Sequence, residues 1–186
     1  KVEQDFKKAE EEHSILSYKS YIQKYPDSKY ANQALQNYLQ LSWRTLKEYD
    51  DYDLYIQFLN NSKEFINIGN VKPYQEKVIH RLQDIYIPQI QNWLRSFRNT
   101  RNDLASHRIT TKMMLATSGN FDAYAEASKP STYEIALSNK ITNLEMALSL
   151  VSTPNANNII DGINIYRGVL QDNRDDIIEI RRSLVR

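Results

Sequence analysis

An internal repeat with a spacing of 34 residues constrains the N-terminal half of this 186-residue chain more than any other feature. Tyr21-Ile22-Gln23 recurs as Tyr55-Ile56-Gln57, and Ser28-Lys29 recurs as Ser62-Lys63. A period of this length is typical of a helix–turn–helix unit that buries its apolar face by stacking on its neighbours. The repeat therefore predicts paired helices in this half of the chain.

The apolar residues around the repeat have helical spacing. Residues 5–24 and residues 29–46 carry apolar side chains at steps of three and four, which predicts one helix over each range. Pro26 ends the first helix because it disfavours helical backbone at the residue before it. Asp27 or Ser28 is expected to cap the second helix by accepting hydrogen bonds from its free amides.

The second copy of the repeat is less regular than the first. A short helix is expected to begin after Asp50 or Asp51 and to extend through Leu59. The segment 65–70 then interrupts the helical pattern, and Pro73 is suited to the first turn of a new helix.

The string SYKSYIQKYPDSKYANQAL, residues 17–35, resembles a variant of the tetratricopeptide repeat with the pattern Y-x-x-F/Y-I-x-x-Y-P-x-S-x-Y/A-x-x-A. The variant resembles repeats of bacterial envelope lipoproteins and of accessory modules in multidomain bacterial proteins. The matching positions are Tyr18, Tyr21, Ile22, Tyr25, Pro26, Ser28, Tyr30 and Ala34.

The resemblance covers roughly residues 5–87, and in the second copy Asn60 replaces the proline. It implies a non-catalytic scaffold that binds peptides or partner helices. It also favours a location in the periplasm or at the outer membrane, with the cytoplasm as the alternative.

The C-terminal half has the pattern of long helices. Residues 89–117, 121–151 and 154–184 are three helical segments of similar length, and Lys129-Pro130 should interrupt the middle one. Pro88 is expected to kink or restart the helix that contains it. Ser118-Gly119-Asn120 is expected to stop the first of these segments. Ser131 and Glu134 match a capping box at a helix start. Thr153 and Pro154 are expected to begin the last helix.

The last helix carries the most regular apolar seam, with steps of four and three from Ile159 to Leu184. Asn173 is the polar position on this seam, where it either sets register or oligomeric state or marks the thinning end of a bundle. The predicted fold is therefore all-α, with tetratricopeptide-like helical repeats over residues 1–87 followed by an elongated, coiled-coil-like antiparallel helical bundle over residues 88–186.

Composition excludes several function classes. The chain has no Cys and only 4 Gly, which removes thiol chemistry and glycine-rich phosphate loops. The three histidines are isolated from one another in the sequence, and no apolar run approaches the roughly 18 residues of a membrane span. We therefore expect no catalytic residues, no cofactor and no metal, and we do not expect an enzyme.

Tyrosine is concentrated in the repeat half, where ten of the 13 lie between residues 18 and 86. Most tyrosines at helical spacing pack between helices. Tyr also suits a binding groove, because its ring offers a large rigid area with a polar tip. The candidates for such a groove are Tyr18, Tyr21, Tyr52 and Tyr55.

A basic stretch in residues 89–112 has a local net charge of +4, although the whole chain has only +1. Its partner-binding candidates are Arg95, Arg98 and Arg101, whose spacing places them along one stripe of a helix. Trp93 and Phe97 lie beside them, and arginine flanked by aromatic rings can bind nucleic acid. The simpler interpretation is a solvated face, or arginines that pair with acidic residues of a neighbouring helix.

These features favour a scaffold or adaptor that binds another protein, and the resemblance implies that it works in a bacterial envelope complex. Self-association through the last helix is a further possibility. Nucleic-acid binding through residues 95–112 is the alternative function.

Overall fold

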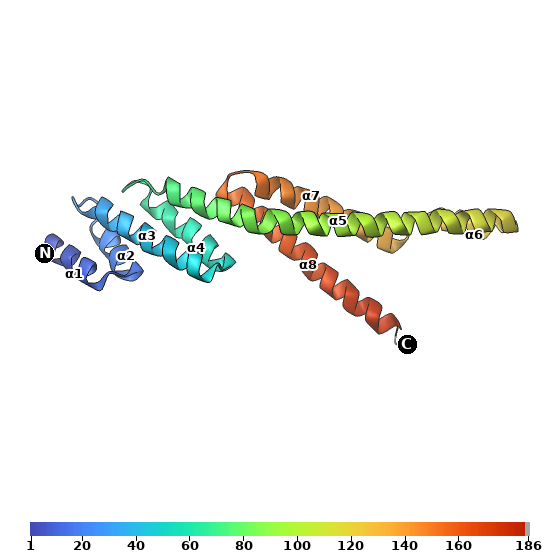
Figure 1. Ribbon diagram of the computed structural model, residues 1–186, viewed down its shortest axis with the longest axis horizontal. Coiled ribbons are helices and arrows are strands. Elements are labelled where there is room, and N and C mark those ends of the chain that lie inside the picture. The colour runs from blue at the N-terminus through green and yellow to red at the C-terminus, as the bar shows by residue number, and fades with distance from the viewer. Residues whose placement is uncertain (185–186) are drawn as a thin grey trace. The chain divides into compact units, whose positions relative to one another are not determined.

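The computed structural model describes the backbone of residues 1–184 and the side chains of residues 1–172, and the described chain is all-α, as predicted (Figure 1). It divides into two compact units, Lys1–Leu82 and Gln83–Arg186. The elements are α1 (Val2–Glu12), α2 (Ile15–Lys24), α3 (Ala31–Tyr49), α4 (Tyr52–Ser62), the 3-10 turn η1 (Lys63–Phe65), α5 (Lys72–Ser118), α6 (Phe121–Ala127), α7 (Thr132–Ser152) and α8 (Ala156–Leu184). The predicted domain boundary at residues 87 and 88 lies inside α5, which contributes residues to both units.

Two helices occupy the range where one helix was predicted for residues 5–24. His13 adopts a left-handed conformation with φ 41° and ends α1. Ser14 then begins α2 with a capping box, in which the backbone N–H of Ser17 donates to Ser14 Oγ at 3.0 Å and the backbone N–H of Ser14 donates to Ser17 Oγ at 3.2 Å. The single-helix prediction was wrong because these reciprocal bonds stabilise a new helix start.

The caps of α3 and α4 differ from each other. The N-cap residue of α3 is Tyr30, which makes no side-chain capping bond, so the predicted cap by Asp27 or Ser28 was wrong. For α4 the prediction is confirmed, because Asp51 Oδ1 accepts a hydrogen bond from the backbone N–H of Leu54 at 3.1 Å.

Aromatic rings form much of the core of the first unit. Phe6 stacks on Tyr30 with ring centroids 4.7 Å apart, and Tyr38 meets Phe65 edge to face at 5.4 Å. Helix α3 packs against α2, and its small residues Ala31 and Ala34 are buried. Small residues on one helix leave room for rings from its neighbour, which explains how a short unit accommodates so many tyrosines.

Asp50 joins three helices of the first unit. It ends α3 in a left-handed conformation, with φ 48°. One of its carboxylate oxygens accepts from the hydroxyl of Tyr55 at 2.6 Å and from Nε of Arg81 at 2.9 Å, and the other forms an ion pair with the Arg81 guanidinium. Arg81 and then Tyr55 hold the pKa of Asp50 below its usual value. Burial, followed by the bond to Asp50, raises the pKa of Tyr55 to about 12.

Helix α5 continues through Pro88, so no new helix begins there, and of the two predicted effects of this proline the restart was wrong. Proline removes a single backbone donor, and the apolar stripe continues on both sides, with Leu82 and Ile90 both fully buried. The predicted stop is confirmed, because α5 ends at Ser118 and Gly119 follows with φ 74°.

The boundaries of α7 are as predicted, whereas α8 begins differently. The helical segment predicted over residues 121–151 is interrupted between α6 and α7, as expected. Ser131 and Glu134 form the expected capping box at the start of α7. The start of α8 is capped by Asn155 and not by Thr153. The side chain of Asn155 accepts a hydrogen bond from the backbone N–H of Asn157 at 2.9 Å. The side chains of Asn173 and of the rest of the predicted seam to Leu184 lie outside the described residues.

Helices α7 and α8 pack closely against each other in the second unit. Gly162 of α8 lies where a Cβ atom would stand 2.7 Å from Cγ2 of Val151 and 2.8 Å from the backbone oxygen of Ala147. A side chain at this position would therefore collide with the backbone of α7. The short connection between Ser152 and Ala156 makes the two helices antiparallel.

Helix α5 contacts both helices of this pair through polar side chains. Gln83 Nε2 donates to the backbone oxygen of Val151 at 2.9 Å, and further along α5 Arg98 reaches Glu145 of α7. Residue numbers that rise along α5 fall along α7, so these two helices are antiparallel. Tyr166 of α8 donates to Oε1 of Gln89 at 3.2 Å, which connects α5 to the third helix.

The glycines of α8 provide a matched test of this packing. Gly162→Ala should destabilise the fold by about 1–3 kcal/mol, because the added methyl group has no space. Gly168→Ala should stabilise it by about 0.5–1 kcal/mol, because Gly168 is exposed, nothing lies within 4 Å of its Cβ position, and alanine favours a helix. Denaturant unfolding followed by circular dichroism measures both changes, and equal effects would contradict the close contact.

The pKa of Asp50 generates a second prediction. Because the folded pKa lies below the ordinary value of about 3.9, the ionised carboxylate contributes stability above that value, and this contribution is lost as pH falls through the lowered pKa. The side chain is 38% exposed, so solvent screening keeps the contribution to about 1 kcal/mol. Asp50→Asn should therefore lose about 1 kcal/mol at pH 7 and approach the wild type towards pH 3.

Unfolding free energies of the wild type and of Asp50→Asn across this pH range test the prediction. Asp27→Asn is the control, since Asp27 is an exposed residue of the same unit and the substitution removes the same charge. A difference between Asp50→Asn and the wild type that stays constant down to pH 3 would contradict the proposed role of the carboxylate.

Candidate functional site

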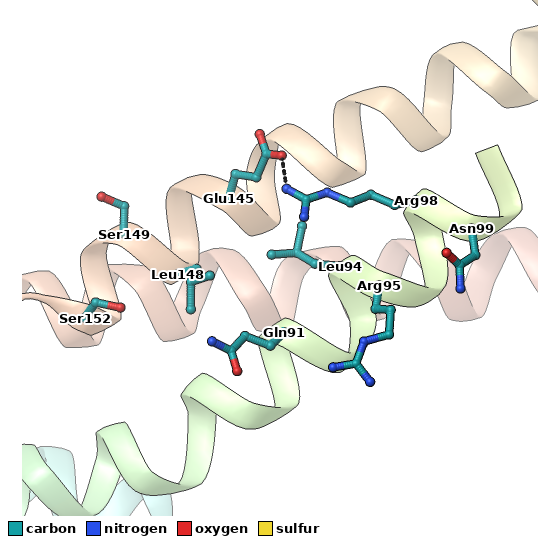
Figure 2. A pocket seen from close by; sticks show the side chains of 9 residues that line it. All are labelled: Gln91, Leu94, Arg95, Arg98, Asn99, Glu145, Leu148, Ser149 and Ser152. Atoms are coloured by element: carbon teal, nitrogen blue, oxygen red, sulfur yellow. Dashed lines mark hydrogen bonds and ion pairs between the residues drawn. The ribbon is translucent and has the colours of Figure 1, made fainter. Parts of the chain in front are cut away.

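An open groove of about 690 Å³ runs between α5 and α7 in the second unit (Figure 2). Its lining side chains come from both helices and are mostly polar. They are Gln91, Leu94, Arg95, Arg98 and Asn99 of α5, and Glu145, Leu148, Ser149 and Ser152 of α7.

Two leucines provide the apolar part of the groove. Leu94 belongs to the buried stripe of α5 and is 4% exposed, and Leu148 of α7 is half-buried. Leu148 has the helical spacing of Leu144 and Val151, which are both fully buried, yet it lies at the edge of their stripe. The groove therefore combines an apolar floor with polar rims.

The three arginines of the predicted stripe do not all lie on the same face of α5. Each step of three residues falls about 60° short of a full turn, so Arg95 and Arg101 lie about 120° apart around α5. Arg98 and Arg95 line the groove, and Arg101 is not among its lining residues. Sequence spacing alone placed all three together.

Arg98 and Arg95 have different surroundings within the groove. Arg98 Nη2 donates to Oε1 of Glu145 at 2.6 Å, and both side chains remain about half exposed, at 50% and 49%. Figure 2 shows the Arg98 side chain directed across the groove to Glu145, whereas the Arg95 side chain points away from α7. Arg95 is exposed and has no ion-pair partner among the side chains of residues 1–172.

The chemistry available in the groove is hydrogen bonding and charge pairing. Gln91 and Asn99 carry amides, and Ser149 and Ser152 carry hydroxyl groups. The nine lining residues include no histidine and a single carboxylate, so they contain neither a nucleophile with a base nor a pair of acids. Within the described side chains, no group of three His, Asp or Glu residues could hold a metal ion.

The rest of the basic stretch is largely occupied by intramolecular contacts. Nε of Arg108 lies 3.3 Å from Oε1 of Glu134, and its Nη1 donates to the backbone oxygen of Ser128 at 2.9 Å. Nζ of Lys112 lies 4.8 Å from the ring centre of Tyr124. Pairing with acidic residues of a neighbouring helix, the simpler interpretation of the sequence, therefore applies to Arg98 and Arg108.

The candidate tyrosines lie mainly in the core of the first unit. Tyr18, Tyr21 and Tyr55 are at most 4% exposed, and Tyr52 is half-buried. The Tyr18 hydroxyl lies 3.0 Å from Nδ1 of His13, and that of Tyr21 lies 2.9 Å from Oγ of Ser28. The three buried rings are covered by other residues of the first unit, so they cannot line a binding groove on its surface.

Sequence reasoning missed several exposed apolar side chains near the end of α5 and the start of α6. These side chains are between 50% and 77% exposed, and they are Ile109, Met113, Met114 and Phe121. The signal in the sequence was apolar residues that fall outside the buried stripe of α5.

Comparison with known proteins adds no relative. No protein-family model, curated protein or solved structure matches the chain significantly. Among the helices of the described residues, none combines the length and the apolar content that crossing a membrane requires.

Two ion pairs between α5 and α7 should differ in strength. The pair of Arg98 and Glu145 is half exposed, so a double-mutant cycle with glutamine at both positions should give a coupling energy below about 1 kcal/mol. Glu134 is 8% exposed, and the backbone amide of Ser131 followed by Arg108 holds its pKa below the usual value. The coupling between Arg108 and Glu134 should therefore be the larger of the two, and a reversed order in denaturant unfolding would contradict this assignment.

Proposed function

We propose that the protein is a non-enzymatic scaffold whose α5–α7 groove receives a segment of a partner protein. The observation that carries the proposal is the groove itself, which is open, has two leucines in its floor and presents amides, hydroxyls and arginines along its rims. Such a combination suits a peptide, because apolar side chains fill the floor while polar rims satisfy the peptide backbone.

The first unit is proposed to be a tetratricopeptide-like repeat region that supports the interaction. The 34-residue repeat and the paired helices α2 and α3 support this part of the proposal. The smaller opening between α3 and α4, about 120 Å³ in volume, is lined by Leu46, Leu54 and Phe58 and by none of the four candidate tyrosines. A bacterial envelope complex remains the proposed setting, on the resemblance of residues 17–35 alone.

Nucleic-acid binding through residues 95–112 has less support from the geometry. Arg98, Arg108 and Lys112 each contact a side chain of the same chain. The groove is lined by no aromatic ring on which a base could stack, since Trp93 and Phe97 are not among its lining residues.

A selection of random peptides against the full chain tests the scaffold proposal. The affinity of each selected peptide is then measured by fluorescence anisotropy for the wild type and for Ser149→Trp, in which a bulky ring occupies the groove. We expect at least a tenfold loss of affinity, equivalent to about 1.4 kcal/mol.

Asn139→Trp is the matched control, because Asn139 is an exposed residue of the same helix that does not line the groove. Failure to select any binding peptide would overturn the proposed function. Equal affinity for the two variants would move the binding site away from the groove.

A further inference from the structure

We infer that residues 119–130 form a strap that opens and closes on α5 as one unit while α5 and α7 stay folded. This α6 strap contains the turn at Gly119, helix α6 and the connection to α7. None of its residues lines the α5–α7 groove, so its opening is independent of the proposed function.

Little apolar surface holds the α6 strap in place. Helix α6 has 7 residues and none of them is buried. The half-buried positions of the strap are Ala123, Tyr124, Ala127 and Ser128. Because hydrophobic stabilisation grows with the area removed from water, the two alanines contribute little. A helix this short is not stable by itself in water, so α6 depends on its contacts with α5.

Two cations of α5 contact the α6 strap. Nη1 of Arg108 donates to the backbone oxygen of Ser128 at 2.9 Å, and Nζ of Lys112 lies 4.8 Å from the ring centre of Tyr124. Residue numbers that rise along α5 fall along α6, so the two helices are antiparallel. Partly exposed contacts of this kind fix the position of a segment but stabilise it only weakly.

The helices on either side of the α6 strap end independently of it. Helix α5 stops before Gly119, which has φ 74° and nothing within 4 Å of its Cβ position. Helix α7 has its own capping box, in which Ser131 Oγ accepts from the backbone N–H of Glu134 at 3.1 Å and Glu134 Oε2 accepts from that of Ser131 at 2.7 Å. Glu134 also pairs with Arg108 at 3.3 Å without any residue of the strap. Opening therefore leaves the cap of α7 and its ion pair to α5 in place.

Opening of the α6 strap changes the surface of α5. The last turns of α5 are exposed except for a half-buried face that includes residues at steps of four, three and four, namely Leu104, Arg108, Thr111 and Leu115. The cation contacts to the strap come from this same face. An open strap would therefore expose Thr111 and Leu115 to solvent.

The α6 strap also forms one wall of an open cavity of about 530 Å³. Ala127 and Lys129 line this cavity from the strap, opposite Leu104 and Thr111 of α5, and Glu134 lines it from α7. The closed strap builds the cavity, and the open strap removes it. The strap thus controls which of two surfaces the end of α5 presents.

Hydrogen exchange of the full chain, followed by NMR at residue resolution, tests the strap. The reporters are the amides of residues 124–128, which bond within closed α6, and the reference amides are those of Leu144 and Ala147 in the buried part of α7. We expect the reporters to be protected, yet to exchange at least about 100-fold faster than the reference amides. Low urea should accelerate the reference amides but hardly the reporters, because local opening exposes little surface.

Gly119→Ala should shift the strap towards its open state. Alanine is disfavoured in the left-handed conformation of the closed turn, and residue 119 can leave that conformation once the strap opens. We expect the reporter amides to exchange about tenfold faster and the reference amides to be unchanged. Gly168→Ala is the matched control, because Gly168 is an exposed glycine of α8 without a positive φ and with nothing within 4 Å of its Cβ position.

Lys112→Gln tests the closing contact from the side of α5. It removes the cation beside the Tyr124 ring and should accelerate exchange of the reporter amides about threefold. Lys47→Gln is the control, because Lys47 is an exposed lysine of α3 and the substitution changes the net charge equally. In every variant the reference amides verify that α7 remains folded, so faster exchange of the reporters cannot come from loss of the fold.

Three results would overturn the inferred strap. Reporter and reference amides that exchange at the same rate, with the same response to urea, would show that α6 opens only when the whole unit unfolds. Reporter amides that exchange as fast as those of an unstructured peptide would show that the strap does not close. Equal effects of Gly119→Ala and Gly168→Ala on the reporters would show that the chain does not open at the turn.

Discussion

The close contact between α7 and α8 at Gly162 organises the second unit. Because no side chain stands between the backbones at that point, Ala147 and Val151 approach α8 directly, and the apolar stripes of both helices are buried between them. Helix α5 has its own buried apolar residues in this unit, such as Ile90, and it reaches α7 through longer polar side chains such as Gln83 and Arg98. The tight contact on one side of α7 and the looser contact on the other together explain why a groove lies between α5 and α7.

The two units use their aromatic and charged residues for different purposes. In the first unit the buried tyrosines build the core, and their hydroxyls bind internal partners such as Asp50. In the second unit Arg95 lines the groove and has no ion-pair partner among the side chains of residues 1–172. Exposed polar and charged side chains therefore line the groove of the second unit, which is where we propose that a partner binds, although the tyrosine-rich half is the more conspicuous one in the sequence.

Local signals predicted some helix boundaries well and others poorly. The capping box of Ser131 and Glu134 and the stop at Gly119 were predicted because each depends on residues within one turn. The break at His13 was missed because the apolar spacing continues across it and a Ser14–Ser17 box is a weaker signal. The predicted restart of the helix at Pro88 did not occur, because a proline removes one backbone hydrogen bond while the flanking turns keep theirs.

Helical periodicity, few glycines and recognisable caps determined from the sequence alone that the chain is all-α and where most of its helices run. Tertiary structure decided which faces are covered. The period of 3.6 residues sets the direction of a side chain around its own helix, but its exposure depends on whether another helix lies there. For this reason only the fold could show that Tyr18 and Tyr55 are buried, and that Arg95 and Arg98 share a groove that Arg101 does not line.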